Sequence, residues 1–209
     1  MMGTPRSLKE KLKKNQLTIG SWVTLGHSAV VEIMGRSGFD WLVFDLEHST
    51  IDVSDCHAMF QASDLCNIPA IVRLTSNDED LIKRVMDAGA SGIMVPMVTS
   101  KSDAERAVEA TYYPPRGVRG VGLARAQGYG ARFAEYRTWL EQNGLVILMI
   151  ENIQAVEVIE DIFSVEGVDG YMIGPYDLSS SMGVPGEFEG EKFRDAIKRI
   201  REAGLKIGL

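Results

Sequence analysis

The feature that most constrains this chain is a unit that recurs along it: a helix that ends in glycine, a short turn and a brief apolar run. It appears at 35–45, 87–96 and 165–174. Glycine suits the left-handed position after a helix, and an apolar run without alternation is typical of a parallel strand buried on both faces. Repetition of the unit predicts helices alternating with the strands of a parallel sheet.

The same pattern places the elements along the chain. Strands are expected at about 18–25, 41–46, 69–74, 92–97, 145–150 and 170–174, with the start of a seventh at 206–209. Helices are expected near 28–37, 53–65, 78–88, 101–111, 131–142, 154–164 and 190–203, after a charged, helical stretch at 8–14.

Seven strand starts separated by helices favour an α/β fold of the (β/α)8 TIM-barrel type, as a single domain over 1–209. A doubly wound nucleotide fold would show a glycine-rich phosphate loop after its first strand, and none follows Trp22 to Gly26. The glycines at 117–122 follow a helix and Pro114-Pro115, which indicates a long loop. A complete barrel typically needs about 250 residues, so we expect this one to be C-terminally incomplete, before its last strands and helices.

Composition narrows the functional classes. With 45% apolar and 24% charged residues among 209, the chain can bury a core and is not disordered. No apolar run approaches the ~18 residues that span a bilayer, so we expect a soluble, cytoplasmic protein without membrane partners. The net charge of -7, with both signs interspersed, argues against nucleic acid and favours a small-molecule ligand. Cys56 and Cys66 are expected to be reduced, structural thiols.

Polar side chains follow four of the apolar runs, at the carboxyl ends where barrel active sites form. They are Asp45, Glu47 and His48 after the second run, Arg73 after the third, Glu151 after the fifth and Asp177 after the sixth.

Glu151 and Asp177 are the candidate metal ligands. A carboxylate at the inner end of an apolar strand is strongly destabilised unless it is paired or binds a metal. Oxygen ligands without cysteine favour Mg²⁺ or Mn²⁺, with Co²⁺ possible, and water and substrate oxygens would complete the shell. The alternative is that the two carboxylates form salt bridges with Arg73 or cap the helices that follow.

His48 and Arg73 are candidate catalytic residues. Histidine titrates near neutral pH, and Asp45 or a neighbouring carboxylate would fix its tautomer; the alternative is a histidine hydrogen-bonded in a loop. The N–H donors of the Arg73 guanidinium match a carboxylate or a developing enolate oxygen. The alternative is that Arg73 is a structural partner of Glu47 or Glu151.

The arginines of the predicted rim loop, near 112–132, are a separate group. We expect most of them to be solvated or to lie between subunits, as for Arg119 and Arg132. Arg125 is the one that we expect to reach an anionic substrate.

In combination these residues resemble a known family, the HpcH/HpaI class II pyruvate aldolases, over 8–209. The resemblance rests on the following segments: Gly38-Phe39-Asp40-Trp41-Leu42, Asp45-x-Glu47-His48, Val72-Arg73, Val95-Pro96-Met97-Val98, Tyr113-Pro114-Pro115-x-Gly117-x-Arg119-Gly120-Val121-Gly122, Ile150-Glu151, Gly167-Val168-Asp169-Gly170 and Ile173-Gly174-Pro175-x-Asp177-Leu178-Ser179.

The resemblance implies a divalent-metal-dependent aldolase that reversibly cleaves a 4-hydroxy-2-oxo acid to pyruvate and an aldehyde. It implies a metal on Glu151 and Asp177, His48 acting through a water as acid or base, and Arg73 stabilising the pyruvate enolate. The pyruvate carboxylate would bind at 174–177, formed by Gly174, Pro175, Tyr176 and Asp177. It also implies a hexamer of barrel dimers that exchange their last helix, and no Schiff-base lysine.

Three departures from the family concern the surroundings of this site. Met149 stands where several members carry glutamine, and the loop at 120–130 is shorter than in well-known members. We also expect the C-terminal part that contributes to the aldehyde pocket in the family to be missing. Two other functions compete with the aldolase reading. One is a related acyl-CoA or citryl lyase, which a basic face would support; the other is a non-catalytic homologue, which would be expected to lose His48 or a metal ligand.

Overall fold

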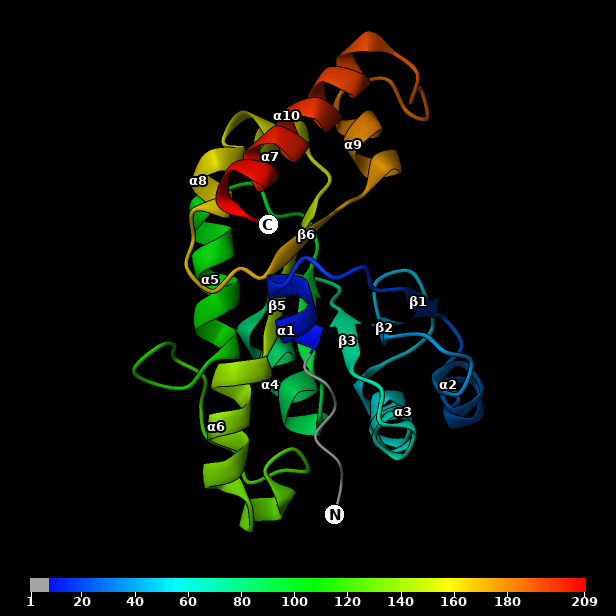
Figure 1. The fold of residues 1–209 in the computed structure, drawn as a ribbon, viewed down its shortest axis with the longest axis vertical. Helices are drawn as coiled ribbons and strands as arrows, with labels where there is room; N and C mark the ends of the chain where they lie inside the picture. The colour runs from blue at the N-terminus through cyan, green and yellow to red at the C-terminus, as the bar shows by residue number, and fades with distance from the viewer. Residues whose placement is uncertain (1–7) are drawn as a thin grey trace.

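The computed structural model describes residues 8–209, and its centre is one parallel sheet of six strands in chain order, from β1 at one edge to β6 at the other. Each strand pairs in parallel with the next one along the chain. The sheet curls, with helices outside it (Figure 1). The strands are β1 Gly20–Val23, β2 Trp41–Asp45, β3 Ala70–Arg73, β4 Gly92–Val95, β5 Leu145–Ile150 and β6 Gly170–Ile173.

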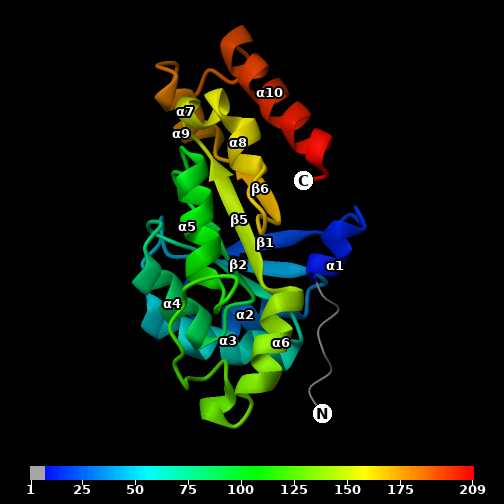
Figure 2. The same ribbon diagram turned by 90° about the vertical axis from the view of Figure 1, so that its left-hand side faces the viewer.

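The helices lie mainly between consecutive strands, as right-handed βαβ crossovers require. Along the outside of the sheet α2 contacts α3, α3 contacts α4, α4 contacts α5, α5 contacts α8 and α8 contacts α10. Figure 2 shows the long strand β5 running from α6 up to α7, with α10 slanting beside α8 at the upper right. The helices are α1 Leu8–Lys13, α2 Ser28–Gly35, α3 Val53–Cys66, α4 Glu79–Ala88, α5 Lys101–Thr111, the 3-10 turn η1 Gly128–Gly130, α6 Phe133–Asn143, α7 Ile153–Glu157, α8 Ile159–Phe163, α9 Pro175–Ser181 and α10 Glu191–Ile207.

The apolar residues form two clusters, one on each face of the curled sheet. The outer cluster lies between the strands and the helices, and includes Phe44 and Phe60 with their rings 5.2 Å apart. The inner cluster fills the concave side with every second residue of the strands, and Leu8 of α1 joins it. Its other buried members are Val43, Ile71, Met94, Leu145, Ile147 and Met149. Burial on both faces explains why the central strands, β2 to β5, read as apolar runs.

Helix α1 is held at the amino ends of β5 and β6 by the buried side chain of Lys9. Its Nζ donates to the carbonyl of Gly144 at 2.7 Å and to the hydroxyl of Tyr112 at 3.2 Å, and lies 2.8 Å from Oδ1 of Asp169. Burial lowers the pKa of Lys9, and the Asp169 carboxylate opposes that shift. The charged N-terminal stretch is thus helical, as predicted, and closes one end of the inner cluster.

The six predicted strands and the TIM-barrel class are confirmed, with three differences in detail. The predicted seventh strand at 206–209 is wrong, because α10 continues to Ile207 and ends at Gly208 with φ 80°. The predicted helix at 154–164 is divided at Val158, whose ψ of 25° interrupts it. Helix α9 was not expected, although Pro175 at its first position is a known start signal.

Two expectations from composition can also be compared with the structure. Both cysteines are free, and Cys56 is buried. No helix among residues 8–209 combines the length and the apolar character that crossing a membrane requires.

Candidate metal-dependent active site

The inner face of the sheet turns polar at its carboxyl edge. Strand side chains alternate between faces, so Asp45 lies on the same face as Val43, Arg73 on that of Ile71 and Glu151 on that of Met149. In the sheet register Asp45 is the partner of Arg73. The structure therefore brings predicted site residues from three strands to one edge.

Asp45 and Arg73 form a buried, two-pronged ion pair at this edge. Arg73 Nε donates to Oδ1 of Asp45 at 2.8 Å and an Nη donates to Oδ2 at 2.5 Å. The guanidinium also lies over the Trp22 ring, 4.5 Å from its centroid. Burial acts to raise the pKa of Asp45, but the bonds from Arg73 and from the amides of His48 and Glu47 outweigh it and lower that pKa. Arg73 is thus rigidly held.

Glu47 adds a second carboxylate to the same guanidinium. Its Oε2 lies 3.4 Å from Nη1 of Arg73, is buried, and has no hydrogen-bond partner among the described residues. Burial and the nearby negative charge of Glu151 raise the pKa of Glu47, and Arg73 only partly opposes them. A buried acceptor without a donor indicates a site for something that supplies one, such as water or a ligand.

Glu151 is buried just beyond β5, and Asp177 is exposed in the first turn of α9. Oε1 of Glu151 accepts the amide of Met97 at 2.7 Å. Burial raises the pKa of Glu151, the Met97 amide lowers it, and the charge of Asp177 raises it further. Neither carboxylate forms an ion pair with any residue of 8–209, so the alternative of a salt bridge to Arg73 is not what the structure shows.

The imidazole of His48 lies at the rim, with 63% of the side chain exposed. Its Nε2 is 4.0 Å from Oε2 of Glu47. Oδ1 of Asp45 accepts the backbone amide of His48, at 3.2 Å, and not a ring nitrogen, so of the two alternatives Asp45 is not the carboxylate beside the ring. Glu47 is the carboxylate beside the His48 ring, and Asp45 forms its ion pair with Arg73.

The segment Gly174, Pro175 and Tyr176 forms the start of α9 beside these carboxylates. The amide of Leu178 makes the first helical bond, to the carbonyl of Gly174, so the amides of Tyr176 and Asp177 have no partner within the helix. The ring of Tyr176 is exposed and meets Phe188 edge to face at 5.0 Å.

The donor set fits a hard divalent cation. Glu151 and Asp177 provide two carboxylates with no cation of their own, while Arg73 is already engaged by Asp45. Within residues 8–209 no three His, Cys, Asp or Glu side chains are grouped as a complete metal cage. Two carboxylates with water and substrate oxygens suit Mg²⁺ or Mn²⁺ better than zinc.

Two arginines of the loop before α6 lie elsewhere. Arg125 forms an ion pair with Asp64 and donates to the carbonyl of Ala88 at 3.0 Å, beside residues that precede β3 and β4. It is therefore at the amino ends of the strands and not among the carboxylates of the candidate site, and its expected role on an anionic substrate stays a prediction. Arg119, expected to be solvated or between subunits, is 1% exposed.

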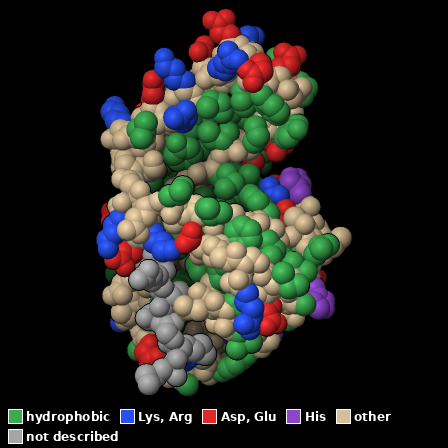
Figure 3. All heavy atoms as spheres, turned by 45° about the vertical axis from the view of Figure 1, so that its right-hand side comes forward, with side chains coloured by type: hydrophobic (Ala, Val, Ile, Leu, Met, Phe, Trp, Pro, Cys, Tyr) green, Lys and Arg blue, Asp and Glu red, His purple; other side chains and the backbone are tan. Residues whose placement is uncertain are grey.

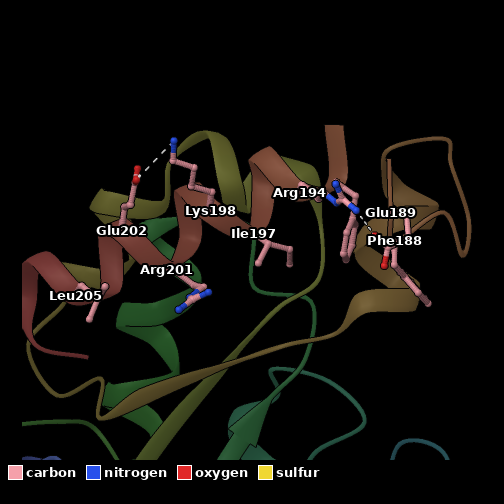
Figure 4. A pocket seen from close by; sticks show the side chains of 9 residues that line it. Phe188, Glu189, Arg194, Ile197, Lys198, Arg201, Glu202 and Leu205 are labelled. Atoms are coloured by element: carbon pink, nitrogen blue, oxygen red, sulfur yellow. Dashed lines mark hydrogen bonds and ion pairs between the residues drawn. The ribbon is translucent and has the colours of Figure 1, made fainter. Parts of the chain in front are cut away.

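The surface is also hollowed away from these carboxylates. Hydrophobic side chains gather over the upper part of one face, fringed by charged ones (Figure 3). A groove of about 510 Å³ runs along α10, with Phe188, Ile197 and Leu205 among its lining (Figure 4). It contains none of the predicted site residues, so the candidate site is defined by its polar groups and not by this groove.

Comparison with known proteins points to one family. The profile of the HpcH/HpaI aldolase/citrate lyase family matches residues 18–209. A pyruvate aldolase from Rhizobium etli is 41% identical over 206 residues, 96% of this chain and 81% of the relative. A 2-keto-3-deoxy-L-rhamnonate aldolase from Escherichia coli is 37% identical over 96% of this chain and 77% of the relative. The crystal structure of a family protein from Burkholderia cenocepacia has a TM-score of 0.91 and 32% identity, over 97% of this chain and 81% of that one.

Fold, site and relatives define the class: a TIM-barrel-like carbon–carbon lyase of the aldolase type. This chain belongs to the HpcH/HpaI aldolase/citrate lyase family. The resemblance inferred from its motifs is confirmed.

Sequence reasoning missed two contributors to the site. The ring of Trp22, on β1, supports Arg73, and the amide of Met97 binds Glu151. Met97 lies two residues after the end of β4, and a search for polar side chains at strand ends does not find a residue that acts through its backbone.

Replacing Glu47 with glutamine should stabilise the metal-free protein at neutral pH. In the folded protein the pKa of Glu47 is raised above its ordinary value of 4.5, which the unfolded chain keeps. The ionised carboxylate therefore destabilises the folded state at pH values above the folded pKa. This destabilisation disappears as the pH falls below 4.5, where Glu47 is protonated in both states. Melting temperatures in EDTA should thus differ at neutral pH and converge below 4.5. Glu166→Gln, at an exposed carboxylate, is the control. An equal gain for both variants, or a gain that persists in acid, would contradict this.

Proposed function

We propose that this protein is a divalent-metal-dependent aldolase that reversibly cleaves a 4-hydroxy-2-oxo acid into pyruvate and an aldehyde. One observation carries the proposal most strongly: Glu151 is buried beside Arg73 at the carboxyl edge of the sheet, with the charge of Asp177 near it, and neither carboxylate forms an ion pair within residues 8–209. A cation between them would remove the repulsion of the two carboxylates. The relatives named as aldolases support the reaction class.

In this proposal Glu151 and Asp177 hold the cation. When bound, it supplies Lewis-acid polarisation of the 2-oxo group and a second contact for the carboxylate of the substrate. The amides of Tyr176 and Asp177, unpaired within α9, face the start of that helix and suit the same carboxylate.

His48 and Arg73 have the two remaining roles in this proposal, proton transfer and stabilisation of the enolate. Cleavage removes the proton of the 4-hydroxyl group, breaks the C3–C4 bond and leaves that electron pair on C3 as the pyruvate enolate, which then takes a proton. His48, exposed at the rim beside Glu47, is the residue placed to move these protons, through a water. Arg73, fixed by Asp45, donates to the enolate oxygen, and its rigidity makes that stabilisation effective.

The test is aldol addition by the purified protein, measured as pyruvate consumption with Mn²⁺ and a panel of aldehydes: succinic semialdehyde, lactaldehyde and tartronate semialdehyde. We expect consumption with at least one aldehyde, and its loss in EDTA. Activity that survives EDTA would overturn the metal-dependent mechanism. Turnover of an acyl-CoA without pyruvate would favour the related lyase function. The identity of the metal, the homo-oligomer implied by the family and the cytoplasmic location stay predictions.

A further inference from the structure

Met97 has a backbone conformation that its residue type disfavours. It follows Pro96, just after β4, with φ 52°, in the left-handed region that is sterically unfavourable for a residue other than glycine. Its side chain is 50% exposed, so burial of that side chain does not account for the conformation. The backbone has one specific partner here: its amide donates to Oε1 of Glu151 at 2.7 Å. Strain of this kind concentrates at functional sites.

Gly174 approaches the same carboxylate from β6. A Cβ atom built on Gly174 would lie 2.6 Å from Oε2 and 2.9 Å from Cβ of Glu151, far inside ordinary contact. Gly174 itself has φ -91° and ψ 93°, which any residue can adopt. Glycine is therefore needed at this position for the close approach to Glu151 and not for its backbone angles.

These two contacts define which oxygen of Glu151 is free. Oε1 is occupied by the Met97 amide, and no hydrogen bond from residues 8–209 reaches Oε2. We propose that Met97 and Gly174 are positioning residues that hold Glu151 so that it binds the cation through Oε2 alone. The inference rests on the proposed function and adds to it how the ligand is oriented.

The variants separate backbone geometry from side-chain chemistry. Met97→Ile keeps an apolar side chain but is β-branched, which makes the left-handed conformation far less accessible and moves the amide. Met97→Gly keeps the amide and removes the strain. Gly174→Ala adds only the methyl group that meets Glu151. We expect Met97→Ile and Gly174→Ala to weaken Mn²⁺ binding by about 10- to 100-fold, as loss of a group supporting a ligand does, and Met97→Gly to bind like the wild type.

Two matched controls account for general damage to the fold. Tyr129 has φ 53° and an exposed side chain in the loop before α6, so Tyr129→Ile introduces the same backbone strain away from the site. Gly170 is the first residue of β6, the strand that Gly174 directly follows, and a Cβ there would meet only the end of the Ile147 side chain at 3.2 Å. Tyr129→Ile and Gly170→Ala should leave Mn²⁺ affinity unchanged, whatever they do to the melting temperature.

The measurement is the Kd for Mn²⁺ alone, by calorimetry or by the electron paramagnetic resonance signal of free Mn²⁺, on protein shown to be folded by circular dichroism. Glu151→Gln distinguishes the two proposals. If it binds Mn²⁺ as well as the wild type, the metal site itself is wrong. If it loses binding while Met97→Ile and Gly174→Ala retain wild-type affinity, the proposed function stands and the positioning role is overturned. Loss of affinity in Met97→Gly equal to that in Met97→Ile would also overturn it.

Discussion

Replacing Glu151 with glutamine should lower kcat/KM for aldol addition by about 10³-fold, because a ligand worth several kcal/mol of charge stabilisation in the transition state is lost. Glutamine has the same shape and keeps an oxygen acceptor for the amide of Met97, so the fold should persist. In EDTA the variant should even be more stable than the wild type at neutral pH, since the raised pKa of Glu151 marks its ionised form as destabilising.

Steady-state kinetics with pyruvate and the best aldehyde of the panel measure this effect, beside melting curves in EDTA. Glu157→Gln, at an exposed carboxylate in the following helix α7, is the matched control and should behave as the wild type. A Glu151→Gln enzyme with unchanged kcat/KM would show that Glu151 is no ligand, and that its burial has another purpose.

Replacing Arg119 with methionine should cause the largest loss of stability, about 3–5 kcal/mol, as expected when one partner of a buried ion pair is removed. The guanidinium donates to Oδ1 of Asp87 at 2.5 Å and to the hydroxyl of Tyr136 at 3.0 Å. It also lies 4.9 Å from the centroid of the Tyr113 ring. Methionine fills much of the space but leaves the Asp87 carboxylate with only the Gln127 amide, at 2.9 Å.

Urea unfolding measures the change, with comparable slopes of the transition as the condition for comparing free energies. Arg137→Met, at an exposed position of α6, should change the free energy of unfolding by less than about 0.5 kcal/mol. A similarly small change for Arg119→Met would mean that the loop between α5 and α6 contributes little to the stability of the fold.

Much of the fold was predictable because the apolar pattern of each segment agrees with the burial of that segment in the folded protein. Apolar runs such as 145–150 are buried on both faces, so their periodicity directly reports the tertiary environment. The errors fell where tertiary contacts override a local pattern. Residues 206–209 look like another apolar run, yet α10 packs through Ala203 and Gly204, with Gly204 close against Tyr171, and the helix continues past them.

The candidate site was predictable for the same reason, up to a limit. Parallel strands end at one edge, so Asp45, Arg73 and Glu151 had to converge there once the strands were assigned. Their pairings were not predictable. The sheet register places Asp45 opposite Arg73, so the Asp45 carboxylate pairs with the guanidinium. Glu47 is then the carboxylate that lies beside the His48 ring.

The sequence by itself determined the alternation of strands and helices, the family and the polar residues at the strand ends, because these depend on local periodicity and on motif spacing. Only the tertiary structure decided that Arg125 lies at the opposite end of the strands, that Arg119 is buried and that a strained Met97 amide holds Glu151. Each of those contacts joins residues more than 30 positions apart in the sequence. Arg119 contacts Asp87, Arg125 contacts Ala88 and Met97 contacts Glu151. No local pattern records such a contact, since it exists only once the sheet has brought the segments together.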